Sequence, residues 1–161
     1  MFTGLSSTRI NPLNATWDWV GRLKKLTSMK IVIKGVETGE DARLARESGA
    51  DGILVSNHGG RATETLRPTI ETVSEVVDAV NNQIPVLVDG GVRRGSDAFK
   101  AIAYGARAVG IGRPYTWGLA SYGQEGVERV LEILNAELTM TMRQCGTPTL
   151  GQIARAHVKH T

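Results

Sequence analysis

The chain has 161 residues, of which 41% are hydrophobic and 22% charged, a size and composition typical of one globular domain. Its net charge of +3 comes from scattered basic residues without interleaved aromatic rings, which argues against a nucleic-acid partner. The single cysteine excludes an internal disulfide, and no apolar run approaches the roughly 18 residues of a membrane-spanning helix. Residues 1–14 lack the apolar core of a signal peptide. We therefore expect a soluble, intracellular protein.

From residue 15 onward, helical patterns alternate with short apolar runs rich in β-branched residues. In chain order we expect a helix over residues 16–26, a strand over 30–34, a helix over 41–48, a strand over 52–56, a helix over 69–80, a strand over 86–89, a helix over 97–103, a strand over 108–111 and a helix over 124–142. The four runs are almost continuously apolar, which is typical of strands buried on both faces of a parallel sheet. The alternation predicts an α/β fold with helices outside the sheet.

An internal repeat narrows the fold further. The sequence Gly-Glu-Asp-Ala at residues 39–42 recurs as Gly-Ser-Asp-Ala at residues 95–98, and the same offset pairs Ala45 with Ala101. Two copies of a (βα)₂ unit make four strands, half of the eight that close a TIM barrel. A flavodoxin-like, doubly wound sheet would also be parallel, but such sheets rarely show this kind of repeat. We therefore predict half of a (β/α)₈ TIM barrel over residues 15–161, preceded by a polar leader over residues 1–14.

A half-barrel of four strands has two unpaired edges and an uncovered inner face. We therefore expect a partner that covers them, either a missing amino-terminal half-barrel or a second copy of this chain. A homo-oligomer is the expected state.

Polar and glycine-rich segments follow each predicted strand, where the active site of a barrel of this kind is built. They are Lys-Gly-Val at residues 34–36, Ser-Asn-His-Gly-Gly-Arg at residues 56–61, Asp-Gly-Gly-Val-Arg-Arg-Gly at residues 89–95 and Gly-Ile-Gly-Arg-Pro at residues 110–114. Every polar group that a catalyst would use is therefore expected at one end of the sheet.

The last two of these segments predict an anion site. Gly90 and Gly91 after the third strand, and Gly112 after the fourth, allow backbone N–H groups to approach a ligand closely. Arg113, at a helix start, could pair with a phosphate in two-pronged fashion. The alternative is that these glycines only make short turns between strands and helices. Two adjacent loops of this type, each with arginine, favour the phosphate site.

The segment at residues 56–61 predicts a general base beside a residue that binds an anion. The imidazole of His58 could accept a proton near neutral pH, although a lone histidine is more often structural. Arg61, three residues on, could hold a carboxylate. Lys34 could be a Schiff-base nucleophile as in barrel aldolases, a fixed positive charge beside a cofactor, or a solvated lysine at a strand end. Asp89 could bind a ligand hydroxyl or cap its own loop.

The four motifs, in this order and spacing, resemble those of the FMN-dependent 2-hydroxy acid oxidases and dehydrogenases, which include glycolate oxidase, lactate oxidase and lactate dehydrogenase. The resemblance covers about residues 12–153. It implies the carboxy-terminal half of the barrel, FMN as cofactor, no metal site, and oxidation of a small L-2-hydroxy acid to the 2-oxo acid. It also makes residues 1–14 the remnant of an active-site loop.

The resemblance assigns a role to each candidate residue and disfavours the aldolase interpretation of Lys34. His58 would remove a proton from the substrate and contact it, while Arg61 would bind its carboxylate. The residues implied in cofactor binding are Lys34 at the N1–C2 edge of the flavin, Ser56 against the flavin, Asp89 on the ribityl chain, and Gly90, Gly91, Val92, Arg93, Gly112 and Arg113 around the phosphate.

The chain also departs from the family pattern. Residues 62–65 are Ala-Thr-Glu-Thr where many members have Gln-Leu-Asp, so the substrate preference is open, as is the electron acceptor. The family's first four strands have no counterpart in this sequence. The resemblance places on them the substrate-binding tyrosines, a second carboxylate-binding arginine and the aspartate that orients the base. The competing hypothesis is a non-catalytic half-barrel that self-associates and at most binds phosphate or FMN. Residues 158–161 do not form a peroxisomal tail, which favours a cytoplasmic enzyme of bacterial type without membrane attachment.

Overall fold

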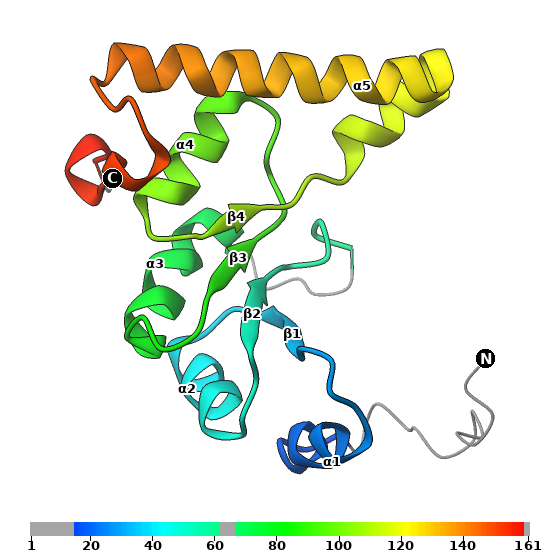
Figure 1. Ribbon diagram of the computed structural model, residues 1–161, viewed down its shortest axis with the longest axis vertical. Coiled ribbons are helices and arrows are strands. Elements are labelled where there is room, and N and C mark those ends of the chain that lie inside the picture. The colour runs from blue at the N-terminus through cyan, green and yellow to red at the C-terminus, as the bar shows by residue number, and fades with distance from the viewer. Residues whose placement is uncertain (1–14, 62–66, 160–161) are drawn as a thin grey trace.

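A computed structural model describes residues 15–61 and 67–159 of the chain (Figure 1). The leader predicted over residues 1–14 and the divergent residues 62–65 lie outside the described residues. In chain order the elements are α1 (Asp18–Leu26), β1 (Val32–Val36), α2 (Gly39–Glu47), β2 (Gly52–Val55), α3 (Thr69–Val80), β3 (Val86–Val88), α4 (Gly95–Ala103), β4 (Ala108–Val109), α5 (Arg113–Gln144) and the 3₁₀ helices η3 (Leu150–Gln152) and η4 (Arg155–His157).

The four strands form one parallel sheet in the order β1-β2-β3-β4, so that each strand lies beside the next one in sequence. Helices α2, α3 and α4 connect successive strands and pack on one side of the sheet (Figure 1). This confirms the predicted α/β class and the arrangement of half of a (β/α)₈ barrel.

Two rows of side chains across the sheet define its two faces. Ile33, Ile53 and Val86 are register partners, and Ile53 and Val86 are buried in the main core with the valines of α3. The neighbouring row contains Lys34, Leu54, Leu87 and Ala108, which are half-buried or exposed. Because alternate strand residues point to opposite faces, Lys34 stands on the face away from the helices. That face corresponds to the inner face of a barrel.

The first strand begins two residues later than predicted, because Asp51 binds the segment before it. The Asp51 carboxylate accepts hydrogen bonds from the Ile31 N–H and the Lys30 ammonium, and it also pairs with Lys24 of α1. The Lys24 hydrogen bond, followed by that of the Ile31 N–H, lowers the pKa of Asp51 to about 2. As a result, Lys34 lies inside β1, next to an irregularity in the register at Gly35, which has a φ of 96°.

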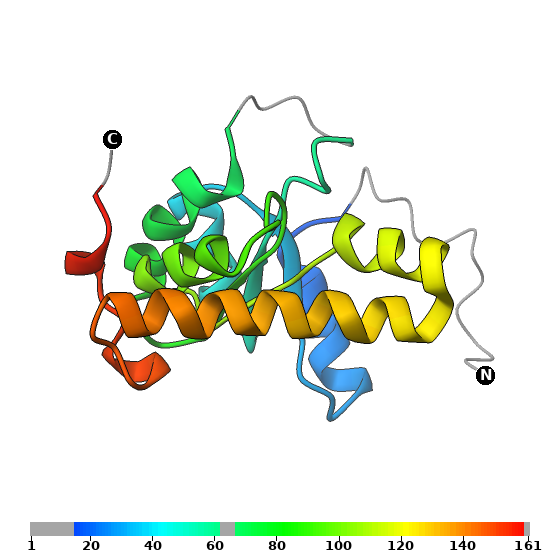
Figure 2. The ribbon, with the colours of Figure 1, turned by 90° about the horizontal axis from the view of Figure 1, so that it is seen from above.

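Helix α5 begins at Arg113, well before the predicted start at residue 124, and it changes direction at Tyr122 and Gly123. The predicted long helix corresponds to the part after this kink. The short and long parts lie side by side in Figure 2. A β-carbon on Gly118 or on Gly126 would overlap the backbone of the other residue. Two glycines therefore allow α5 to fold back on itself.

Candidate functional site

A cavity of about 340 Å³ is lined by Lys34 of β1 and by the segments that follow β2, β3 and β4. Every residue that the sequence singled out as a site residue lines this cavity, with the exception of Ser56. The lining residues among them are Lys34, His58, Arg61, Asp89, Gly90, Gly91, Val92, Arg93, Gly112 and Arg113. The fold therefore brings together residues of β1 and of the segments that follow β2, β3 and β4, as expected for a barrel of this class.

Lys34 is held at one side of this cavity by two polar partners. Its ammonium donates a hydrogen bond to the Ser56 hydroxyl over 2.8 Å and lies 3.7 Å from a carboxylate oxygen of Asp89. Ser56 itself is fully buried. An ammonium fixed between a hydroxyl and a carboxylate provides a localised positive charge on the inner face of the sheet.

His58 lies in a tight turn that directs its ring toward β1. Its φ is 54°, and those of Gly59 and Gly60 are 72° and 73°, so three successive residues occupy the left-handed region. For a histidine this conformation costs about 1–3 kcal/mol, and such strain concentrates at functional sites. The His58 N–H donates to the Ser56 hydroxyl over 3.2 Å. A β-carbon on Gly35 would lie 3.2 Å from the His58 ring, so the glycine makes room for the imidazole.

Asn57 and Thr69 stabilise the loops around His58, although sequence reasoning assigned neither of them a role. The Asn57 side-chain oxygen accepts a hydrogen bond from the Gly59 N–H over 3.0 Å. The Thr69 hydroxyl donates to the carbonyl of Asp89 over 2.7 Å and is 3.2 Å from that of Gly90. An Asn after a buried strand is a familiar turn former and could have been noticed, whereas a threonine at a helix start gives no such signal.

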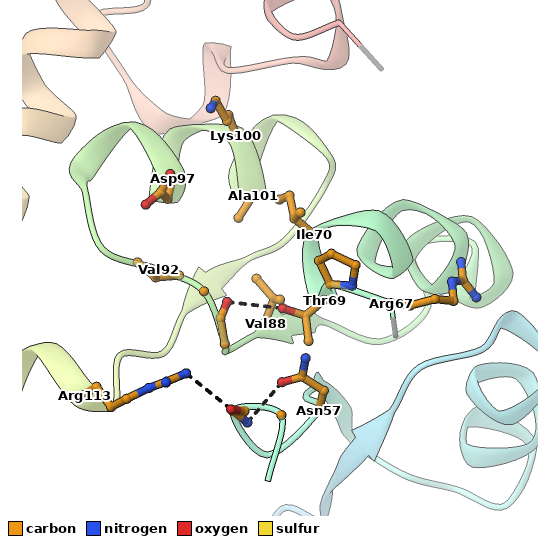
Figure 3. Close-up of a pocket in the computed structure, with 15 residues that line it drawn as sticks. Asn57, Arg67, Thr69, Ile70, Val88, Val92, Asp97, Lys100, Ala101 and Arg113 are labelled. Atoms are coloured by element: carbon orange, nitrogen blue, oxygen red, sulfur yellow. Dashed lines mark hydrogen bonds between the residues drawn. The ribbon is translucent and has the colours of Figure 1, made fainter. Parts of the chain in front are cut away.

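The other side of the cavity suits an anion. Helix α5 begins after Gly112 with no side-chain cap, and a β-carbon on Gly112 would meet nothing within 4 Å. The start of this helix therefore has no side-chain partner, and Gly112, Arg113 and Arg93 line the cavity there. Arg113 donates a hydrogen bond to the Gly59 carbonyl over 3.3 Å, and Figure 3 shows its side chain directed at that turn. This bond connects the anion side to the loop of His58.

A larger cavity of about 820 Å³ lies behind the same loops, between α3 and α4 (Figure 3). It shares Gly59, Gly90, Gly91, Val92 and Arg113 with the smaller one, but apolar side chains of α3, β3 and α4 also line it. Since His58 and Lys34 line only the smaller cavity, the candidate chemistry belongs there. Among residues 15–61 and 67–159, no three His, Cys, Asp or Glu side chains are grouped to hold a metal ion. None of the helices described is long and apolar enough to cross a membrane.

Residues 5–160 match the family described as FMN-dependent dehydrogenase. The chain is 51% identical to a peroxisomal (S)-2-hydroxy-acid oxidase of Oryza sativa over 143 residues, covering 89% of this chain and 39% of that protein. It is 46% identical to the glycolate oxidase of Spinacia oleracea, covering 97% and 43%. A crystal structure of mandelate oxidase superimposes with a TM-score of 0.84 at 46% identity, covering 88% of this chain and 42% of that one. The chain thus spans less than half the length of these relatives.

The expected cytoplasmic location is wrong on this comparison. The oxidase of Oryza sativa and two similar oxidases of Arabidopsis thaliana are peroxisomal by name. The expectation rested on the lack of a short peroxisomal tail, and such a tail is an address read by a receptor that has no connection with the fold or the site.

Proposed function

Since the chain belongs to the family of FMN-dependent dehydrogenases, we propose that it provides the base and the cofactor-binding half of an enzyme that oxidises an (S)-2-hydroxy acid to the 2-oxo acid. Membership confirms the resemblance seen in the motifs and confirms FMN as the cofactor of the family. The relatives' names also support a peroxisomal location for the enzyme. The observation that carries the proposal is the meeting of ten predicted residues, from β1 and from the segments that follow β2, β3 and β4, around one cavity.

The residues around the smaller cavity fit FMN on chemical grounds. One side has a fixed ammonium, Lys34, beside the hydroxyl of Ser56 and the carboxylate of Asp89. The other side has an uncapped helix start at Gly112 with two arginines. A flavin mononucleotide has a ring that becomes anionic on reduction and a phosphate at the far end of its ribityl chain, which corresponds to these two sides.

Each side chain then has a defined task. Lys34 and Ser56 would bind the polar edge of the ring, and Asp89 would accept a hydrogen bond from a ribityl hydroxyl. The phosphate would be held by the backbone of Gly90, Gly91 and Val92 together with Arg93, Gly112 and Arg113. When bound, FMN accepts the two electrons that leave the substrate. The protein contributes orientation, charge and proton transfer.

His58 would take the proton that the substrate loses, and Arg61 would bind the substrate carboxylate. Both side chains line the cavity from the same turn, so the carboxylate-binding arginine and the base are oriented together. The strained left-handed backbone of His58 is maintained by the Asn57 and Ser56 hydrogen bonds, which aims the imidazole before substrate arrives. Preorganisation of this type is what a general base needs.

Residues 15–161 would then form one half of a complete barrel, joined to an amino-terminal half or to a second copy of this chain. A second candidate function is a half-barrel that binds FMN or phosphate without catalysis. Two observations favour it for the isolated chain: it spans less than half the length of its relatives, and Val32, on the face of Lys34, is 49% exposed. The next experiment separates the two.

The test is a visible absorption spectrum of the chain with FMN, taken before and after anaerobic addition of L-lactate or glycolate. A bound-flavin band that bleaches would establish oxidation by this chain alone. A band that persists would support the non-catalytic half-barrel, and the measurement would be repeated on the chain refolded with the amino-terminal half of the Spinacia oleracea glycolate oxidase. Persistence in that completed barrel would contradict the proposed enzyme.

Replacing Arg113 with alanine should weaken FMN binding about ten-fold or more, because a charge-assisted pair with the phosphate is lost. Riboflavin, which lacks the phosphate, should bind the variant as it binds the wild type. Quenching of flavin fluorescence gives both affinities. Arg67→Ala is the matched control, since Arg67 lines only the larger cavity and pairs with Glu75. An equal loss of FMN affinity in both variants would place the phosphate elsewhere.

A further inference from the structure

Arg93 is restrained by three contacts within the described chain. The carbon of its guanidinium lies 5.1 Å from the ring centroid of Trp117. One of its guanidinium nitrogens donates to the Val92 carbonyl over 3.1 Å, and its backbone N–H donates to the Asp97 carboxylate over 2.9 Å. An unrestrained arginine samples many rotamers and loses that freedom when it grips a ligand. The contacts with Trp117 and with the Val92 carbonyl restrict the guanidinium in advance, while the Asp97 bond fixes the backbone of Arg93.

Trp117 belongs to neither hydrophobic cluster of the described residues. Its side chain is 56% exposed although it belongs to the largest apolar type. It lies on the first part of α5, four residues after Arg113 and on the same segment whose uncapped start faces the smaller cavity. An exposed indole has little packing value at this position, whereas the face of an indole is the best aromatic surface for a guanidinium.

We propose that Trp117 is a positioning residue for the anion site: its indole face holds the Arg93 guanidinium flat, so that the free N–H edge is presented to the phosphate of the cofactor. This inference rests on the proposed function, because it takes that anion to be the phosphate of FMN. The α5 segment then supplies three things to one phosphate: the N–H groups of a helix start, the Arg113 cation and a support for the Arg93 cation. Trp117 itself touches neither substrate nor cofactor.

The chain contains a matched control for this contact. On α1 the guanidinium of Arg22 lies 5.4 Å from the ring centroid of Trp19, so the same pair of residue types makes the same kind of contact. Neither residue lines the smaller or the larger cavity. A substitution at Trp19 therefore reports the general effect of removing an indole that stacks on arginine.

The experiment measures FMN and riboflavin affinities of the full 161-residue chain by flavin fluorescence, with inorganic phosphate as competitor. The variants are Trp117→Leu, Trp117→Phe, Arg93→Ala, the double variant Trp117→Leu with Arg93→Ala, and Trp19→Leu. Trp117→Leu should weaken FMN binding about three- to five-fold, the value of an exposed cation–π contact, and leave riboflavin binding unchanged. Trp117→Phe should recover part of this loss, and Trp117→Leu should cost nothing further once Arg93 is alanine.

Several outcomes would overturn the inference. Trp117 would have only a general structural role if Trp117→Leu weakened FMN and riboflavin binding equally. The same would follow if Trp117→Leu weakened FMN binding as much in the Arg93→Ala background as in the wild type, or if Trp19→Leu weakened FMN binding to the same extent. If the wild-type chain prefers FMN over riboflavin and Arg113→Ala removes that preference while Trp117→Leu does not, the proposed function stands and this inference alone fails. A wild-type chain that binds neither flavin nor phosphate contradicts the phosphate site and the inference together.

Discussion

Replacing His58 with alanine in the completed barrel is expected to leave FMN bound and to slow its reduction by a 2-hydroxy acid by about 10²–10⁴-fold, the usual contribution of a general base. The expectation follows from the position of the ring, which lines the cavity but makes none of the predicted phosphate contacts. Anaerobic stopped-flow absorbance of the flavin band measures the rate of reduction, and the spectrum before mixing measures the amount of bound flavin.

Alanine at this position also disfavours the left-handed backbone, so a second variant is needed. Asparagine tolerates positive φ much better than alanine, and His58→Asn therefore retains the turn while removing the base. Both variants should be slow if proton removal is the role of His58. His157→Ala, far along the chain, should reduce at the wild-type rate. Normal reduction in His58→Asn would show that the histidine serves only the turn.

The second large effect concerns stability. Replacing Gly95 with alanine is expected to destabilise the chain by about 3 kcal/mol, at the upper end of ordinary overpacking. A β-carbon at Gly95 would overlap the backbone of Leu134, Glu137 and Leu138 on α5, and backbone cannot move aside as a flexible side chain can. Urea unfolding followed by circular dichroism gives the change in the free energy of unfolding.

The same substitution disturbs a polar contact between α4 and α5. The Glu137 carboxylate accepts a hydrogen bond from the Gly95 N–H over 2.8 Å and pairs with Arg94 over 2.8 Å, and the first of these is the main cause of its lowered pKa. Gly21→Ala in α1 is the control, because nothing lies within 4 Å of the added carbon. Alanine there should be neutral or stabilising by up to about 1 kcal/mol. Equal unfolding midpoints for the Gly95 variant and the wild type would contradict the close approach of the helices.

The sequence predicts those parts of this molecule that depend on local pattern. The run around Ile53 and Val55 is apolar throughout because both faces of a barrel strand are covered, and so it could be recognised as a strand. The position of His58 and Arg113 near each other followed from one rule, that parallel strands end at one edge of the sheet. Their hydrogen-bonded connection through Gly59 confirms that they are neighbours.

Local sequence patterns do not predict contacts between segments that are distant in the chain. The shift of β1 arises from Asp51, which is distant in sequence and binds the Ile31 N–H. The early start of α5 was missed because Trp117 and its apolar neighbours on this segment are exposed, so no buried stripe marks the first part of the helix. Pro114, two residues after Gly112, is a helix-start signal that the sequence contains. The contact of Arg93 with Trp117 joins the segment before α4 to the first part of α5, and no periodic pattern in the sequence marks it.

His58, its turn and the two phosphate-side arginines, Arg93 and Arg113, lie within four consecutive βα units. This arrangement has a consequence for how such enzymes diversify. If these residues have the proposed roles, proton removal and cofactor retention are inherited together as one contiguous stretch of sequence. A recombination event that exchanged the strands outside this stretch would then alter which acid the pocket accepts and preserve the redox chemistry. Substrate range and catalytic machinery could therefore evolve at different rates within a single barrel.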